Sequence, residues 1–536
     1  MFTSDELARS LMGHIPFTWL PMNPDAAAAT LTADAAVPAA PIPIPTPTTT
    51  TDAAAMQHYY LNSWLHASLM QPAVVQTATE EARRRQDQEE EAASIRLVHL
   101  LITCTGAIQA GDYSVAHGNL TEARAILKKI PTSTGIGRVG THFTDALAQR
   151  LFPAYPHAAA LPSCLPPATP PATYNHFYDA GPYLKFAYSA ANRAILKAFE
   201  GCKRVHIIDF ALMQGLQWPA LMEELSKREG GPPELRITGI GPNPTSGRDE
   251  LHEVGVRLAE FARYMKIPFT FQGVCADHLD HLTAWIHLKL RPDEALAMNS
   301  ILQLHRLLVD PDADESTMPA PIDILLKLVV KLKPKIFTVV EQEADHNKPR
   351  LLERFTNALF HYATMFDSLE AVCSAVNVSA AAARSSTNTS TTSSLAEAYL
   401  RGEIFDIICG EGNARLERHE LCTAWNERLT RAGFTQVEFN LSEANMEITE
   451  LINESSFSGA GFDILQGSGG LALAWQGRPL YVATAWHAMG GGNAASAAIA
   501  HTKEGDSYQK GKNSSGSGGG KGNRGRCGVA GGITFL

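Results

Sequence analysis

The fold is decided by KRVHIIDF, Lys203 to Phe210. This short run is rich in β-branched residues, which favours a buried strand, and an acid stands near its end. In the segment that follows, GLQWPALMEELSKR, the apolar residues recur at helical spacing and predict one buried helix face: Trp218, Leu221, Met222 and Leu225. The sequence therefore predicts a strand followed directly by a helix.

The same alternation continues downstream. LRITGIG (235–241) predicts a second strand, and a helix is expected from about Asp249, with Ser246 and Asp249 forming its capping box. Further strands are predicted at 269–274, 294–300 and 335–343. Alternating strands and helices predict a parallel sheet with right-handed crossovers.

The two ends of this core have other patterns. Three apolar stripes at helical spacing, beginning at Leu97, Leu120 and Val139, place a helical region before the first strand. Residues 462–486 read as a hairpin, LALAW and PLYVATAW separated by QGR. A closing antiparallel hairpin resembles the arrangement of S-adenosylmethionine-dependent methyltransferases. The predicted fold class is therefore α/β, a Rossmann-like, mostly parallel sheet with an α-helical cap.

A cofactor pocket is not expected. A dinucleotide or adenosyl ligand needs a glycine-rich turn after the first strand, because the backbone must approach the ligand closely. Here Asp209 is followed by Phe210, Leu212 and Met213, with one glycine, Gly215. His305-Arg306, Glu341, Glu343 and Arg418-His419-Glu420 are better explained as buried ion pairs, and His206 as a core histidine. We predict no catalytic, cofactor-binding or metal-binding residues and no enzyme.

Composition limits the chain further. The 536 residues carry a net charge of −10, which argues against direct electrostatic binding of nucleic acid. No apolar run reaches the ~18 residues of a membrane span, and the start, MFTSDELARS, lacks the pattern of a signal peptide. Eight cysteines without a CxxC motif predict a reducing compartment. We expect a disordered acidic arm (1–93), a folded domain (94–489), a disordered Gly-rich basic tail (490–536) and a surface loop at 379–394.

Five motifs, read in order, resemble the GRAS family of plant transcriptional regulators. They are a leucine-rich region, VHIID, a second leucine-rich region, a PFYRE region and a terminal SAW-like motif. VHIID is Val205, His206, Ile207, Ile208 and Asp209. The PFYRE and SAW regions contain Tyr399, Arg401, Glu403, Arg415, Glu417, Arg418, His419, Glu420, Trp425, Trp475 and Trp486. Within the family, the segment 174–196 and the strings QGLQWPALM and EQEADHN look most like DELLA proteins.

The resemblance implies a nuclear co-regulator that represses gibberellin signalling by binding transcription factors. Neither sequence-specific DNA binding of its own nor association with a membrane is expected. The resemblance also implies a gibberellin receptor, an F-box ubiquitin ligase and a GRAS homo- or heterodimer as partners. The receptor-binding arm would comprise Asp5, Glu6, Leu7, His58, Tyr59 and Trp64, which match the family's DELLA and VHYNP segments only in part. The alternatives are a scarecrow-like GRAS developmental regulator outside gibberellin control and, more distantly, a methyltransferase-like small-molecule binder.

Two sets of apolar residues could either bind a partner or pack in the core. Leu97, Leu100 and Leu101, and Leu304, Leu307 and Leu308, spell LxxLL, the pattern of a helix that docks in a partner's groove. The first set also fits the stripe that packs the cap. Trp218, Trp425, Trp475 and Trp486 could anchor an interface, whereas core packing is the simpler reading for Trp218 and Trp475.

Overall fold

The computed structural model describes twelve parts of the chain: residues 20–21, 78–131, 134–152, 171–242, 249–276, 279, 290–312, 319–383, 389–439, 461–467, 470–488 and 533–535. Most of the two ends predicted to be disordered lies outside these residues, but the expectation was wrong for 78–93, which form the first turns of a helix (Ala78–Ala110). The six residues of the expected receptor-binding arm also lie outside the described residues: Asp5, Glu6, Leu7, His58, Tyr59 and Trp64.

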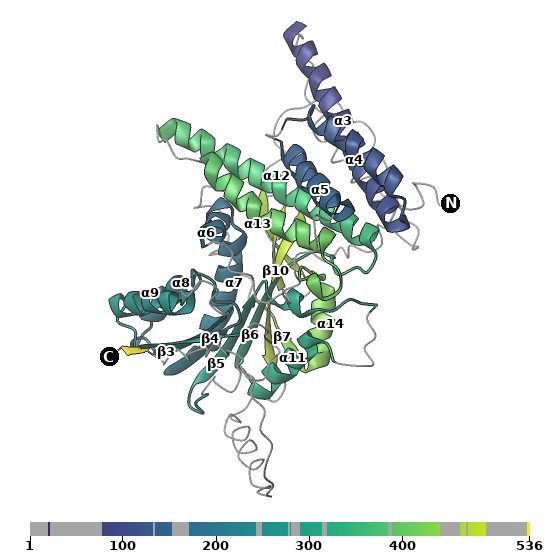
Figure 1. Cartoon of the computed structure of the whole chain (residues 1–536). Helices are drawn as coiled ribbons and strands as arrows, with labels where there is room; N and C mark the ends of the chain where they lie inside the picture. The colour runs from purple at the N-terminus through teal and green to yellow at the C-terminus, as the bar shows by residue number, and fades with distance from the viewer. Residues whose placement is uncertain are drawn as a thin grey trace, which may run out of the picture.

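A single large sheet forms the centre of the molecule (Figure 1). Its parallel strands lie in the order β4–β3–β2–β5–β6. Their bounds are β2 (Arg204–Asp209), β3 (Glu234–Gly241), β4 (Phe269–Cys275), β5 (Ala295–Ile301) and β6 (Ile336–Gln342). Each of the five strands was expected within two residues of these bounds, so the predicted α/β fold with a mostly parallel sheet is confirmed.

The antiparallel part of the sheet is larger than the predicted hairpin. β10 (Arg478–Ala488) lies antiparallel to β6, with Trp486 opposite Phe337, and also pairs with β9 (Gly470–Trp475). Two further strands extend it, β8 (Phe462–Gly467) on β9 and β7 (Phe434–Val437) on β10. The sheet edges carry β1 (Leu20–Pro21) on β8 and β11 (Ile533–Phe535) on β4.

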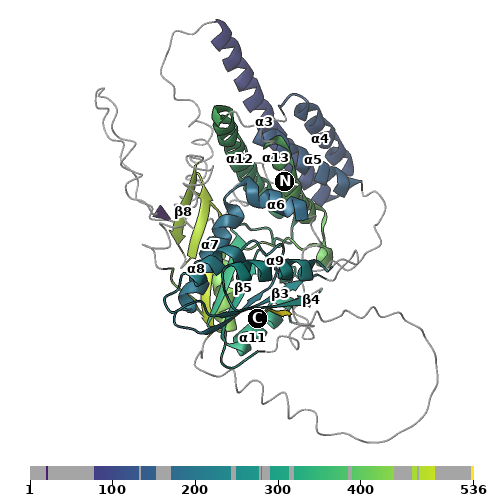
Figure 2. The same cartoon turned by 90° about the vertical axis from the view of Figure 1, so that its left-hand side faces the viewer.

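Helices cover both faces of the sheet because successive side chains of a buried strand point to opposite sides. Val205 and Ile207 of β2 belong to the large core under one set of helices, whereas Ile208 belongs to the core under the other set. The first set is α7 (Tyr183–Ala198), α8 (Trp218–Ser226) and α9 (Glu250–Tyr264). The second is α11 (Pro321–Leu332) and α14 (Cys422–Ala432) (Figures 1 and 2).

The helical cap lies beyond one end of the sheet, at the top of Figure 1. It contains α3 (Ala78–Ala110), α4 (Tyr113–Leu127), α5 (Gly135–Leu151), α6 (Pro171–Ala180), α12 (Leu351–Ala383) and α13 (Thr389–Cys409). Within the described residues, the segment 83–110 of α3 is the one helix long and apolar enough to cross a membrane. Its Leu97, Leu101 and Cys104 are at most 1% exposed and pack into the core, so here α3 serves as a cap helix.

Two expectations about helix ends were wrong. The loop predicted at 379–394 is largely helical, since α12 continues to Ala383 and α13 begins at Thr389. The alanines at 380–383 explain part of this, because alanine has the highest helix propensity. The capping box predicted from Ser246 and Asp249 also differs: Asp249 is itself the N-cap, its carboxylate accepting the His252 amide at 2.9 Å, and Ser246 lies outside the described residues.

Candidate functional site at the carboxyl ends of the strands

In a parallel sheet of this kind a ligand would bind beyond the carboxyl ends of the strands. β2 carries VHIID to that edge. His206 sits in the middle of the strand, fully buried, with its Nε2 2.8 Å from Thr238 Oγ1 on β3. Burial, aided by the charges of Arg236 and Arg291, holds the pKa of His206 well below its usual value. His206 is thus a neutral core histidine, as the sequence suggested.

Asp209, the last residue of β2, is the acid that reaches the edge. Its Oδ2 accepts a hydrogen bond from the Trp218 indole at 3.1 Å, and its Oδ1 accepts from the Asn299 amide at 3.4 Å. Burial raises the pKa of Asp209 to about 6 despite these donors. The carboxyl group that could face a ligand is therefore engaged in holding α8 and β5 against β2.

The turn after β2 packs closely on the neighbouring strand β3. Leu212 lies over Gly239 of β3 so closely that a Cβ on Gly239 would stand 2.5 Å from Leu212 Cδ2. The Leu212 amide donates to the Ile240 carbonyl at 3.1 Å, which fixes the turn against the neighbouring strand. Leu212 is 3% exposed. An apolar side chain of the protein itself thus occupies the position where a glycine-rich turn would leave room.

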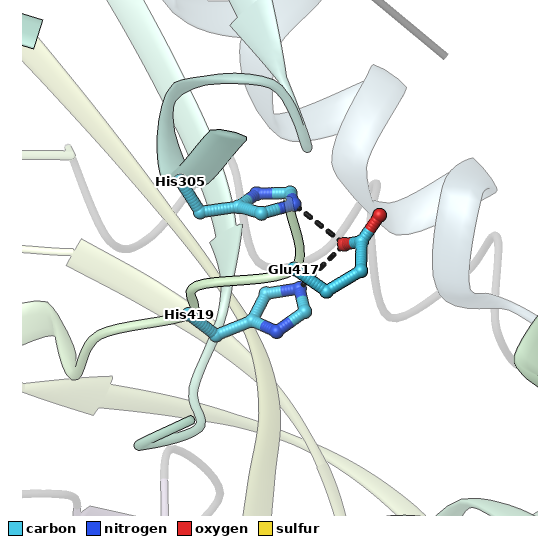
Figure 3. Close-up of side chains that lie close together, drawn as sticks. All are labelled: His305, Glu417 and His419. Carbon is cyan, nitrogen blue, oxygen red and sulfur yellow. Dashed lines mark hydrogen bonds and ion pairs between the residues drawn. The ribbon is translucent and has the colours of Figure 1, made fainter. Parts of the chain in front are cut away.

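A second buried cluster lies at the end of β6, centred on His305 (Figure 3). His305 belongs to η2 (Leu304–Leu307), the 3-10 turn that follows β5. Its Nδ1 is 2.6 Å from Glu341 Oε2 on β6, and its Nε2 is 2.8 Å from Glu417 Oε2 in the segment before α14. Arg306 donates to the other oxygen of Glu417. One imidazole therefore joins three segments that are far apart in the sequence.

The charges of this cluster follow from its contacts. Burial alone would lower the pKa of His305, but Glu341 and Glu417 outweigh it and raise the pKa to about 9. Burial alone would raise the pKa of Glu417, and Arg306 and His305 instead hold it below its usual value. Without another cation at this point, His305 is an imidazolium between two carboxylates.

His419 lies beside His305 as a neutral ring. The two rings stack with centroids 4.2 Å apart, and His419 Nδ1 is 3.0 Å from Nδ1 of His346. Burial, with the charge of His305, keeps the pKa of His419 well below its usual value. Its Nε2 points toward Glu417 Oε2 at 3.5 Å and has no hydrogen-bond partner among the described residues.

The neighbouring residues of the PFYRE region hold loops together. Arg415 Nη1 donates to the carbonyls of His346 and Lys348 at 3.2 and 3.1 Å, and burial lowers the pKa of Arg415 to about 10. Arg418 donates to Asn347 Oδ1 at 3.0 Å, and Glu420 accepts from Asn347 Nδ2 at 2.9 Å. These contacts fix the segment 415–420 against residues 346–348.

The residues of α13 in this region differ from one another. Glu403 is buried and accepts a hydrogen bond from Tyr362 Oη at 2.8 Å. Its pKa is raised, mainly by burial and further by the negative charge of Glu417. The Tyr399 ring stacks on Phe177 at 4.5 Å. Arg401 is exposed, with its guanidinium 4.1 Å from the centre of the Phe405 ring. Of the three, Arg401 is exposed, Tyr399 is half-buried and Glu403 is buried.

The leucines and tryptophans singled out in the sequence are all buried. Exposure does not exceed 5% for Leu97, Leu100, Leu101, Leu304, Leu307, Leu308, Trp218, Trp425, Trp475 and Trp486. The docking helix expected at 304–308 is wrong, because η2 is a four-residue 3-10 turn. Trp475 donates to Asp367 Oδ2 at 2.7 Å and Trp486 to Thr484 Oγ1 at 2.9 Å, so their polar atoms are also satisfied inside the fold.

Sequence reasoning missed the participation of His346 and Asn347. Both belong to EQEADHN, which the sequence singled out only for its resemblance, and both lie 69 or more residues before their partners at 415–420. Glu341 could be identified from the sequence because it is an acid at the end of a predicted strand. The expectation that ligands bind at strand ends says nothing about loop residues, so it could not identify His346 and Asn347.

Comparison with known proteins agrees with the sequence motifs. The model of the GRAS domain family matches residues 97–487. The chain is 53% identical to "Protein SLENDER RICE1-LIKE 2" of Oryza sativa subsp. japonica, over 77% of this chain and 79% of that protein. It is 40% identical to "DELLA protein RGA" of Arabidopsis thaliana, over 73% of this chain and 62% of that protein.

A solved structure shares the fold as well. The crystal structure of SCL7 in Oryza sativa has a TM-score of 0.59 and 27% identity, covering 73% of this chain and 99% of that chain. The family match extends over all five sequence motifs, most of the cap, the central strands of the sheet and both buried clusters. This chain therefore belongs to the GRAS domain family.

Proposed function

We propose that this protein is a nuclear transcriptional co-regulator that binds transcription factors and acts as a DELLA-like repressor of gibberellin signalling. Family membership supports a regulatory role, and relatives about 40% identical carry the name DELLA protein. Its further partners would be a gibberellin receptor on the N-terminal arm, an F-box ubiquitin ligase on the GRAS domain and a second GRAS chain.

The observation that carries the non-enzymatic part of this proposal is Leu212 over Gly239. With Leu212 in the turn and Asp209 bonded to Trp218, the carboxyl edge of the sheet is used for packing. The net charge of −10 favours protein partners over direct contact with DNA phosphates. The fold thus supports action through binding of other proteins.

The test is a pull-down of the full chain with a gibberellin receptor, with and without hormone. Hormone-dependent capture is expected. It should be lost when Asp5, Glu6 and Leu7 are replaced together by alanine. A second variant replaces His58, Tyr59 and Trp64, so that the two halves of the arm are tested separately. Capture that is absent, or equal with and without hormone, would remove gibberellin control and leave family membership intact.

A truncation of the arm must respect helix α3. The helix begins at Ala78, so removal of residues 1–93 would cut it, whereas removal of 1–77 leaves it whole. The truncated protein should keep the melting temperature of the full chain and lose capture by the receptor. A fluorescent fusion of the same two proteins would show whether both accumulate in the nucleus, as we expect.

The second candidate function is that of a scarecrow-like GRAS developmental regulator outside gibberellin control. It is favoured by the arm itself, in which Asp5-Glu6-Leu7-Ala8 matches only the first part of the DELLA segment. In that case hormone treatment should leave the abundance of the full chain and of the 1–77 truncation equally unchanged. The more distant possibility, a small-molecule binder, predicts heat in calorimetry with S-adenosylmethionine, and we expect none.

A further inference from the structure

The cluster around Glu417 brings three possible donor atoms close together (Figure 3). His305, Glu417 and His419 each present one such atom, and these atoms lie within 4.8 Å of one another. All three residues are at most 4% exposed. The sequence predicted no metal ligands because His305 lies more than a hundred residues from the other two.

An unpartnered nitrogen points into the same place. His419 Nε2 is fully buried, has no hydrogen-bond partner among the described residues, and faces Glu417 Oε2 at 3.5 Å. If His419 Nδ1 donates to His346 Nδ1, 3.0 Å away, then Nε2 carries a lone pair aimed at a carboxylate oxygen. Two lone pairs facing each other in a buried site repel, and a cation between them removes that repulsion.

Each of the three residues is also held by a contact outside the donor set. His305 Nδ1 is 2.6 Å from Glu341, His419 Nδ1 contacts His346, and the second oxygen of Glu417 accepts from Arg306. Metal-binding histidines characteristically bond a carboxylate or another fixed group through their second ring nitrogen, which orients the ring. The arrangement of His305 with Glu341 is of this kind.

We propose that His305 Nε2, His419 Nε2 and Glu417 Oε2 bind one divalent ion of the zinc class. Two imidazoles and one carboxylate suit zinc better than magnesium or calcium, which prefer oxygen ligands. Tetrahedral zinc with bonds near 2.0–2.1 Å places neighbouring donors about 3.3 Å apart. The observed separations from Glu417 Oε2 are 2.8 and 3.5 Å, and since the two imidazole rings stack with centroids 4.2 Å apart, the His419 ring turns on binding so that both lone pairs point at the ion.

The ion would connect parts of the fold that are remote in sequence. His305 lies in η2 after β5, and Glu417 and His419 lie in the segment between η3 (Gly412–Ala414) and α14. A bound ion replaces the proton shared by His305 Nε2 and Glu417 Oε2 and links the same two segments more strongly. Its role is structural, since it holds the PFYRE segment on the carboxyl edge of the sheet.

The experiment measures metal in the full chain purified without chelators. About one equivalent of zinc is expected by mass spectrometry of the metal, and cobalt added to the metal-free protein should give visible absorption. His419→Gln should lose both signals. His361→Gln is the matched control, because His361 is half-buried nearby, bonds Gln342 at 2.9 Å and lies outside the donor set.

The wild-type protein decides the question even if a variant fails to fold. Removal of metal by a chelator should lower its melting temperature, and zinc should restore it, while the His361→Gln variant behaves in the same way. Folded wild-type protein with less than about a tenth of an equivalent of metal, and without a cobalt spectrum, would overturn the proposal. The cluster would then be held by the His305 imidazolium and Arg306 with their carboxylates.

Discussion

The contact between Leu212 and Gly239 can be tested by adding one methyl group. Gly239→Ala would place a Cβ 2.5 Å from Leu212 Cδ2 and 3.0 Å from Leu212 Cβ. Leu212 is buried and its amide is bonded to Ile240, so the side chain cannot leave without disturbing the turn. Overpacking of this kind costs about 1–3 kcal/mol of unfolding free energy.

The pair of residues gives a sharper result than either alone. Leu212→Ala should cost about 2–5 kcal/mol, because it removes a buried side chain. In the double variant the new methyl at 239 enters the space that Leu212 leaves. The combined loss should therefore fall below the sum of the two single losses by at least about 1 kcal/mol.

The assay is equilibrium unfolding in urea, followed by tryptophan fluorescence. Gly402→Ala is the matched control, because a Cβ there meets nothing within 4 Å on the exposed side of α13 and should stabilise the helix by up to about 1 kcal/mol. If Gly239→Ala is as harmless as Gly402→Ala, or if the two losses simply add, Leu212 does not pack on Gly239 as described.

Three further predictions concern buried groups. The pKa of Asp209 rises from 3.8 unfolded to about 6 folded, so its favourable contribution is complete below pH 3.8 and is lost as the pH rises through 6. Relative to Asp209→Asn, the wild type should therefore lose about 2.4 kcal/mol between pH 4 and 7, measured by urea unfolding at each pH; a pH-independent difference would contradict this. Glu417→Gln leaves Arg306 without its carboxylate and His305 with Glu341 alone, and should cost about 3–5 kcal/mol in metal-free protein. Glu234→Gln, at a residue whose side chain is 39% exposed, should cost under about 1 kcal/mol, and equal losses would refute the role of Glu417. Leu304→Ala should cost about 2–5 kcal/mol of unfolding free energy, measured by thermal unfolding, because Leu304 is buried. The control Tyr264→Ala, at an 80% exposed residue, should cost about 0.5 kcal/mol or less. Equal, small losses would mean that Leu304 does not pack in the core and is free to dock on a partner.

The parallel sheet could be predicted because its strands are buried on both faces. Such strands read as continuous apolar runs, and the helices between them show one apolar face each, as 204–209 and 218–226 do. The strand β7 was missed because it is four residues long and borders β10 only at its end. A pairing of that kind depends on the tertiary fold and leaves little local pattern.

The candidate site could be predicted only in part, for a related reason. Asp209 and Glu341 were found because both stand at strand ends, where the topology alone assigns a place. The meeting of His305 with Glu417 and His419 depends on how a 3-10 turn and a loop fold back over β6, which no local pattern records. The leucines at 304–308 were wrongly predicted to form a docking helix because a buried 3-10 turn can have the same LxxLL pattern.

The most direct test of the central claim is transcription from a reporter gene in plant cells. We predict that the full chain changes reporter output when it is fused to a foreign DNA-binding domain that recognises the promoter, and has no effect on the same promoter when unfused. This result is expected of a protein that reaches DNA through others. Equal effects of the fused and unfused chains, or no effect of either, would contradict the account.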